Sequence, residues 1–196
     1  MFFALEGGAL VALIIAGVIV LLIFCVVVWF ISTRNRFIRL EQDVENSLSR
    51  IDVYLTKRFD LLTKQLGAVK GYMKHEKETL VETIAMRNQA PGKAASIKEK
   101  AEFNAELDRV ASQINVVMEQ YPTLKADAVF KELQGNITEV EENLQAARSN
   151  YNANVSNFNK SILQFPASLV AGSRFTKKDY FEAEESKRKD VEIKFD

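Results

Sequence analysis

The chain has 196 residues, and its 26 Lys or Arg residues are balanced by 26 Asp or Glu residues, so its formal net charge is zero. This balance provides no overall attraction for nucleic acid, and we expect no nucleic acid among its partners. The single cysteine excludes an intramolecular disulfide.

The N-terminal region contains an uncharged apolar run from Ala9 to Ile31. A helix needs about 20 apolar residues to cross the hydrocarbon core of a bilayer. A cleaved secretory signal would have a basic leader and a shorter apolar stretch, whereas the leader here lacks Lys and Arg. We therefore predict that residues 1–33 form an N-terminal tail and a retained transmembrane helix.

Basic residues after the apolar run predict its orientation. Arg34, Arg36 and Arg39 follow the run, whereas no basic side chain precedes it. By the positive-inside rule, the N-terminus lies outside and the rest of the chain lies in the cytoplasm. Trp29 and Phe30 are expected at the inner interface as aromatic anchors. Membrane lipid is therefore a predicted partner, because the arginines can also hold anionic headgroups.

The first helix after the span is expected to continue from it without a break. Apolar residues recur every three or four positions from Phe37 to Ile84, with one skipped turn between Met73 and Leu80, a spacing typical of one buried helical stripe. The prediction extends this helix to about Asn88, because Pro91 and Gly92 then end it.

A second helix is predicted between two clear signals. The segment Ser96–Glu99 fits a capping box, in which serine and glutamate satisfy each other's backbone amides. Pro122 ends the helix, because the residue before a proline is pushed out of the helical region.

A third helix has the most regular apolar seam, with alternating steps of three and four from Phe130 to Tyr151. The pattern continues to Pro166. Beyond it, the segment Thr176–Asp179 fits the cap of one last short helix around Tyr180 and Phe181.

Together these patterns predict an all-α fold, since alternating strand patterns are absent. The N-terminal transmembrane helix continues into a long-helix antiparallel bundle of three main helices plus a short C-terminal helix. The expected organisation is tail and span in 1–33, the helical bundle in 34–166, and a C-terminal tail in 167–196.

The predicted helix lengths leave one apolar stripe without a partner. At about 1.5 Å per residue, the first helix is about 80 Å long and the second about 40 Å. In an up-down-up arrangement, no helix of the same chain covers the membrane-proximal stripe, which consists of Phe37, Leu40, Val44, Leu48, Ile51 and Leu55. Exposing it is costly, since each buried Leu or Ile is worth about 1.5–3 kcal/mol. The tail, the membrane surface or other copies of the chain can cover it. We favour other copies, and hence a homo-oligomer.

Several short motifs resemble the bacterial LemA family in their order and spacing. They are Ser49–Leu61, Val69–Leu80, Tyr121–Ala126, Glu141 with Arg148, Tyr151-Asn152, Phe165-Pro166 and Tyr180-Phe181-Glu182. The resemblance implies a single-pass protein of the bacterial inner membrane with a cytoplasmic antiparallel helical bundle. It implies no reaction. Such chains usually carry a proline within the segment that here reads Asp60–Leu66, and its loss removes a kink.

The sequence contains no recognisable catalytic or metal-binding motif. His75 is the only histidine, and a metal site would need further ligands of its kind. No Gly-rich phosphate loop follows a strand. We therefore assign no catalytic, metal or cofactor-binding residue and predict that the protein is not an enzyme.

A line of polar residues is the remaining candidate site. On the third helix these residues lie within about 40° on one face, and they are Glu141, Arg148, Asn152 and Asn159. The matching charges of the first helix are Asp52, Arg58 and Asp60. They form either an inter-helix network that fixes register or a face that binds a protein or peptide partner. If the network interpretation holds, Arg148→Leu lowers the melting temperature.

Two functions follow from these expectations. The first is a non-enzymatic, membrane-anchored helical scaffold that self-associates at the cytoplasmic face of the membrane. The alternative is a monomeric sensor or adaptor that binds a protein or peptide partner, with a role in envelope stress.

Overall fold

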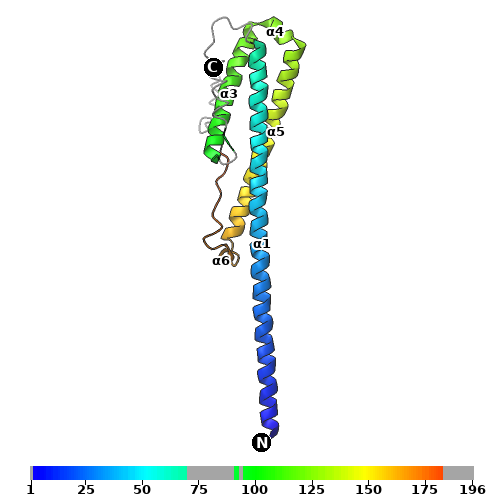
Figure 1. Cartoon of the computed structure of the whole chain (residues 1–196), viewed down its shortest axis with the longest axis vertical. Coiled ribbons are helices and arrows are strands. Elements are labelled where there is room, and N and C mark those ends of the chain that lie inside the picture. Colours follow the sequence, from blue (N-terminus) through cyan, green and yellow to red (C-terminus); the bar gives the residue numbers. More distant parts are fainter. Residues whose placement is uncertain (1, 70–90, 93–94, 183–196) are drawn as a thin grey trace, which may run out of the picture. The chain divides into compact units, whose positions relative to one another are not determined.

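The computed structural model describes residues 2–69, 91, 92 and 95–182. The helices of these residues are α1 (Phe2–Val69), α3 (Ile97–Gln120), α4 (Pro122–Ala126), α5 (Ala128–Leu163) and α6 (Ser168–Ala171) (Figure 1). No strand occurs within this part of the chain. The predicted all-α class is therefore confirmed.

The chain divides into two compact units. Unit 1 consists of residues 1–42 and 157–178, and unit 2 consists of residues 43–156 and 179–196. Both α1 and α5 therefore contribute residues to each unit. The expected boundaries at residues 33 and 166 remain a prediction.

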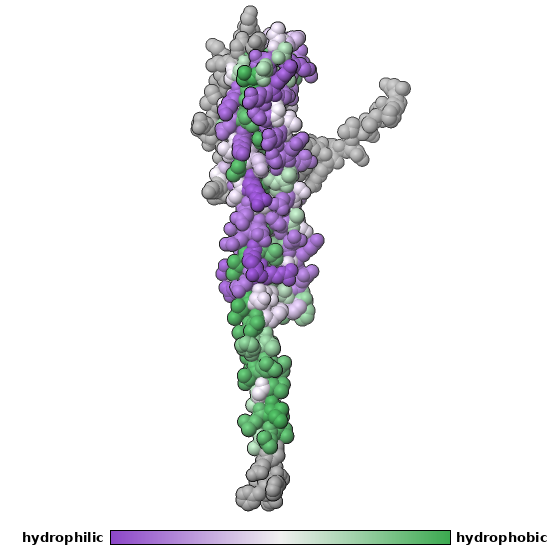
Figure 2. Space-filling model, turned by 90° about the vertical axis from the view of Figure 1, so that its right-hand side faces the viewer, coloured by the Kyte–Doolittle hydropathy of each residue, from purple (hydrophilic) through white to green (hydrophobic). Residues whose placement is uncertain are grey.

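In unit 1, the N-terminal part of α1 carries apolar side chains that are exposed on its surface. Every large apolar residue from Leu10 to Ile31 is exposed, and Figure 2 shows this part of α1 as a continuous hydrophobic surface. Among the described helices, α1 alone is long and apolar enough to cross a membrane. It is the candidate membrane span.

The rest of unit 1 has an aromatic core supplied by three segments of the chain. The ring of Phe175 lies 5.3 Å from that of Phe37 on α1 and 6.4 Å from that of Phe158 on α5, measured between centroids. Lys178, near the end of the same segment, forms an ion pair with Glu41 at 2.7 Å. The C-terminal segment therefore folds back on α1.

In unit 2, α3 runs parallel to α1. Lys100 of α3 binds Asp52 of α1 at 2.5 Å, and six residues later along α1, Arg58 bonds to Asn104 at 2.7 Å. Contacts that advance in the same direction on both helices define a parallel pair, so the predicted up-down-up order is wrong.

The predicted continuation of the first helix after Val69, to about Asn88, lies outside the described residues. Pro91, which follows that stretch, lines a small cavity together with Asp52 and Leu55. Pro91 therefore lies beside the C-terminal half of α1.

The structure also corrects the expectation of an uncovered apolar stripe. Phe37 in unit 1 and Val44, Ile51 and Leu55 in unit 2 are each no more than 4% exposed. Leu40 and Leu48 are partly buried, and each residue is thus covered within its own chain. The reason is that α5 runs antiparallel to α1 and the C-terminal segment folds back, so the length mismatch does not arise.

The short C-terminal helix forms earlier than predicted. It is α6, Ser168–Ala171, whereas the segment around Tyr180 and Phe181 is not helical. The backbone N–H groups of Lys178 and Phe181 donate to the side chains of Asn159 and Asn152, at 2.9 and 2.8 Å. A helix would need these same groups for its own ladder.

The predicted signals at the ends of α3 are confirmed. The Ser96 hydroxyl accepts from the backbone N–H of Glu99, and the Glu99 carboxylate accepts from the backbone N–H of Ser96. These bonds from Ser96 hold the pKa of Glu99 below its ordinary value. At the other end, Pro122 begins α4.

Candidate functional site: a groove with an unpaired arginine

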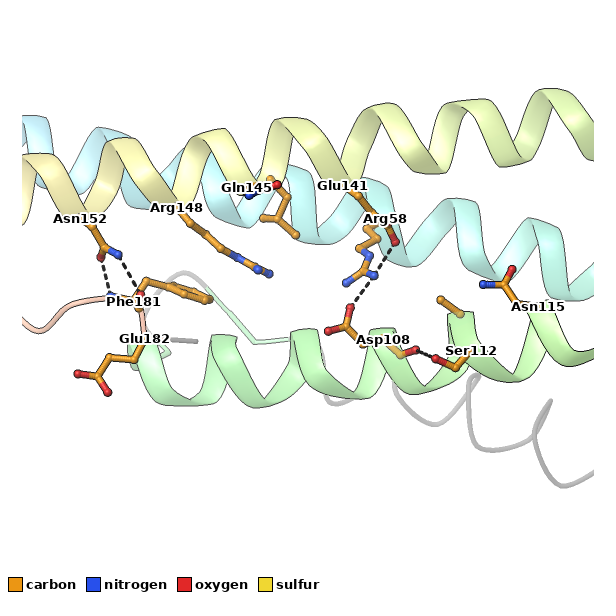
Figure 3. A pocket seen from close by; sticks show the side chains of 12 residues that line it. Arg58, Asp108, Ser112, Asn115, Glu141, Gln145, Arg148, Asn152, Phe181 and Glu182 are labelled. Carbon is orange, nitrogen blue, oxygen red and sulfur yellow. Dashed lines mark hydrogen bonds and ion pairs between the residues drawn. The ribbon is translucent and has the colours of Figure 1, made fainter. Parts of the chain in front are cut away.

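A groove of about 830 Å³ opens on unit 2 between α1, α3, α5 and the segment that follows Asp179 (Figure 3). Its lining is mixed polar and apolar, and consists of Arg58, Asp108, Ala111, Ser112, Asn115, Glu141, Leu144, Gln145, Arg148, Asn152, Phe181 and Glu182. Two of these side chains are cationic, and they differ in their pairing.

Arg58 of α1 is paired with both neighbouring helices. Its guanidinium group donates to Asn104 Oδ1 and Glu141 Oε1, each at 2.7 Å, and forms an ion pair with Asp108 at 2.7 Å. The Arg58 side chain is only 5% exposed, whereas the two carboxylates are 30% and 43% exposed. One buried cation thus fixes α3 and α5 against α1.

Arg148 of α5 lies in the same groove without such partners. Its Nε and Nη2 atoms are buried and have no hydrogen-bond partner. Burial, followed by the positive charge of Arg58, lowers the pKa of Arg148, and the Asp108 carboxylate opposes this shift. The guanidinium carbon lies 4.9 Å from the centroid of the Phe181 ring, as in a cation–π contact. Arg148 is therefore a largely desolvated cation with an unsatisfied donor edge, an arrangement that costs free energy.

The wall of the groove beside Arg148 is an extended segment held by α5. Asn152 donates to the carbonyl oxygen of Phe181 at 3.0 Å and accepts from its N–H at 2.8 Å. The Tyr151 hydroxyl donates to the carbonyl oxygen of Asp179 at 2.9 Å. These side chains bind peptide backbone, and they place the Phe181 ring against Arg148.

The Tyr151 hydroxyl gives this wall a measurable pH dependence. Burial, and then the Asp179 carboxylate, raise the pKa of Tyr151 to about 12. The folded state therefore keeps a proton that an unfolded tyrosine, with a pKa of about 10, loses first. The stabilisation is complete below about pH 10 and is lost as the pH rises towards 12.

We expect the melting temperature of the native protein to fall more steeply between pH 10 and 12 than that of a Tyr151→Phe variant. Melting curves across this range, recorded by circular dichroism, measure the difference between the two slopes. Because lysines also titrate at this pH, only the difference is diagnostic. Equal slopes would contradict the buried position of the hydroxyl.

The structure divides the predicted polar line. It brings Arg58, Glu141, Arg148 and Asn152 together in the groove. Asn159 belongs to unit 1, where its side chain donates to the carbonyl oxygen of Lys178 at 2.9 Å.

The other two predicted charges of α1 lie outside the groove. Asp60 is exposed. Asp52 binds Lys100, whose side chain is completely buried and also donates to the carbonyl oxygen of Gly92 at 3.2 Å.

Sequence reasoning missed three polar partners on α3, namely Lys100, Asn104 and Asp108. Lys100 and Asn104 lie on the buried seam of α3 together with Leu107. A polar residue at a seam position signals a buried partner, because a buried polar group needs a hydrogen bond. Asp108 lies beside the seam and gives no comparable signal.

Within the described residues, no group of three or more His, Cys, Asp or Glu side chains is arranged to hold a metal ion. His75 lies outside these residues. The assignment of no metal and no cofactor stays a prediction.

Comparison with known proteins finds a family model that covers the groove. The model of the LemA family matches residues 47–195, a region that includes every residue lining the groove. The chain belongs to the LemA family. Protein LemA of Metamycoplasma hominis is 26% identical over 112 residues, which are 57% of this chain and 51% of that protein. This LemA family chain thus spans about half the length of the curated relative it matches.

Proposed function

We propose that this LemA family chain is a non-enzymatic, membrane-anchored adaptor that binds an acidic segment of a protein partner in the groove of unit 2. The observation that supports it best is the unsatisfied edge of Arg148. A carboxylate accepts two parallel hydrogen bonds from a guanidinium edge, and such charge-assisted pairs are among the strong ones.

The pairing of the charges in the groove, and not their sum, favours an anionic ligand at Arg148. Three carboxylates line the groove, those of Asp108 on α3, Glu141 on α5 and Glu182, and the first two are already bound to Arg58. A carboxylate supplied by a partner would accept hydrogen bonds from the Nε and Nη2 atoms of Arg148, and it would relieve the cost of the desolvated cation.

The form of the groove favours a peptide as the carrier of that anion. Its wall already binds one extended backbone, through Asn152 and Phe181. The exposed polar side chains of Asn115 and Gln145 offer further donors and acceptors along the groove. Catalysis gains no support, since the Ser112 hydroxyl donates to the backbone carbonyl of Asp108 and not to a base.

The adaptor is proposed as a single copy in the membrane. The apolar stripe from Phe37 to Leu55, from which self-association was expected, is covered by its own chain. Self-association remains a prediction, but this stripe no longer provides a reason for it. The apolar part of α1 serves as the anchor, with the basic residues after it on the cytoplasmic side.

Site-specific photo-crosslinking in cells tests the adaptor. A photoreactive amino acid at Gln145 lies in the groove, and one at the exposed Glu139 of the same helix serves as the matched control. We expect the Gln145 probe to capture a partner protein. Adding Arg148→Met should reduce this capture about tenfold, because a charge-assisted hydrogen bond contributes about 1.5–3 kcal/mol.

The captured segment provides the second half of the test. A synthetic peptide of that segment should bind the purified full chain, and replacing its Asp and Glu residues by Asn and Gln should abolish binding. Capture that persists in the Arg148→Met variant, or capture of further copies of this chain only, would contradict the proposal.

A further inference from the structure

The turn between α5 and α6 in unit 1 carries an exposed apolar patch. Leu163, Phe165 and Leu169 are 58%, 82% and 71% exposed. Neighbouring residues fix this turn, since Val170, which follows Leu169 directly, is buried in unit 1. Large apolar groups held outward in this way indicate an interaction surface.

The patch lies at the level where the candidate span ends. In unit 1, Arg36 of α1 donates to the Ser161 hydroxyl of α5 at 3.5 Å, and α5 runs antiparallel to α1 there (Figure 1). At about 1.5 Å per residue, Leu163 then lies opposite Arg34, and the turn continues towards Ile31. Ile31 is the last residue of the apolar run.

The charge around the patch is strongly asymmetric. Residues 32–42 and 157–178 together contain seven basic residues and one acidic residue, a net charge of +6, although the whole chain is neutral. The acidic residue, Glu41, is already paired with Lys178. The basic residues are Arg34, Arg36, Arg39, Lys160, Arg174, Lys177 and Lys178.

We propose that this end of unit 1 is a bilayer-binding surface. The turn inserts Leu163, Phe165 and Leu169 into the interface of the same leaflet from which α1 emerges, and the surrounding basic side chains bind anionic lipid headgroups. Apolar insertion combined with basic contacts is the general form of such binding. The proposal rests on the membrane anchor of the proposed function and is independent of the groove.

Tryptophan fluorescence in lipid nanodiscs tests the insertion with the full-length chain. Trp29 is the only tryptophan and reports on the span. A Trp29→Phe, Phe165→Trp variant reports on the turn, and a Trp29→Phe, Asn157→Trp variant is the matched control, because Asn157 is exposed and farther from the span. We expect brominated lipid to quench Trp29 and the tryptophan at 165 strongly, and the tryptophan at 157 hardly at all.

The quenching pattern separates failure of this inference from failure of the anchor. Quenching of Trp29 without quenching at position 165 would overturn the insertion of the turn alone. Absence of quenching at both positions would overturn the membrane anchor and the insertion together. Blue-shifted emission at 165 that grows with protein density but resists brominated lipid would assign the patch to a second copy and overturn the proposal.

Lipid charge tests the basic part of the surface. We expect several-fold stronger quenching at position 165 in anionic nanodiscs than in zwitterionic ones. Neutralising Lys160 and Lys177 to Gln should reduce this difference, and because these side chains are exposed, the variant should retain the native melting temperature. A native-like dependence on lipid charge after neutralisation would contradict the role of these residues.

Discussion

Replacing Phe175 by alanine is expected to lower the free energy of unfolding by about 3–5 kcal/mol, the usual cost of deleting a buried phenylalanine. The side chain is 5% exposed and packs against the rings of Phe37 and Phe158. Its removal opens a cavity and also detaches the segment that covers Phe37. Urea unfolding of the full-length chain in mild detergent, followed by circular dichroism, gives the value.

Phe165 provides the matched control, because it is the same residue type in the same segment but is 82% exposed. Phe165→Ala should change the free energy of unfolding in detergent by less than about 0.5 kcal/mol. If Phe175→Ala changes the free energy of unfolding as little as Phe165→Ala does, the C-terminal segment does not cover α1. The uncovered stripe would then again favour self-association.

Replacement by methionine should destabilise the protein at Arg58 and change its stability little at Arg148. Arg58→Met is expected to lower the free energy of unfolding by about 2–3 kcal/mol, less than for a fully buried pair because Asp108 and Glu141 are partly solvated. The variant leaves both carboxylates and Asn104 without the cation that they share.

Arg148→Met should change the free energy of unfolding by less than about 1 kcal/mol. The variant removes a desolvated charge whose Nε and Nη2 atoms have no hydrogen-bond partner, and it gives up the attraction to Asp108 and the contact with Phe181, which is worth about 0.5–1 kcal/mol. The same urea titration measures both variants. A loss for Arg148→Met as large as that for Arg58→Met would mean that Arg148 is part of the structural network, and the adaptor would lose its main support.

This expectation reverses the one from the sequence, which linked a structural Arg148 to a loss of stability on mutation. Position on a helical face showed that Arg148 lies on the same side as Glu141, because the helical period is fixed. It did not show which of the two bonds to Arg58. The pairing of Arg58 depends on the position of α3, because α3 contributes two of its partners, Asn104 and Asp108.

Local rules predicted the helices well and their arrangement poorly. The capping box at Ser96 and the stop at Pro122 depend on neighbours in sequence, and both are confirmed. The direction of α3 depends on contacts between residues far apart, such as Asp52 with Lys100, which periodicity does not encode. The same limit explains the error about the apolar stripe.

The C-terminal segment shows a further reason why patterns fail. Its backbone is bound by amide side chains of α5, through Asn152 at Phe181 and Asn159 at Lys178. Asparagine is common on exposed helical faces, so its sequence position does not reveal a bond to a distant backbone. The segment around Tyr180 and Phe181, which was predicted to form a last short helix, is therefore extended and bound to α5.

Because the chain covers its own apolar stripe, we expect it to present its groove as a single membrane-anchored copy. Native mass spectrometry of the full-length protein in lipid nanodiscs measures the copy number from the intact mass. We expect one chain of 22.2 kDa in each disc at low protein-to-lipid ratio. A defined multimer that persists on dilution with lipid would contradict it.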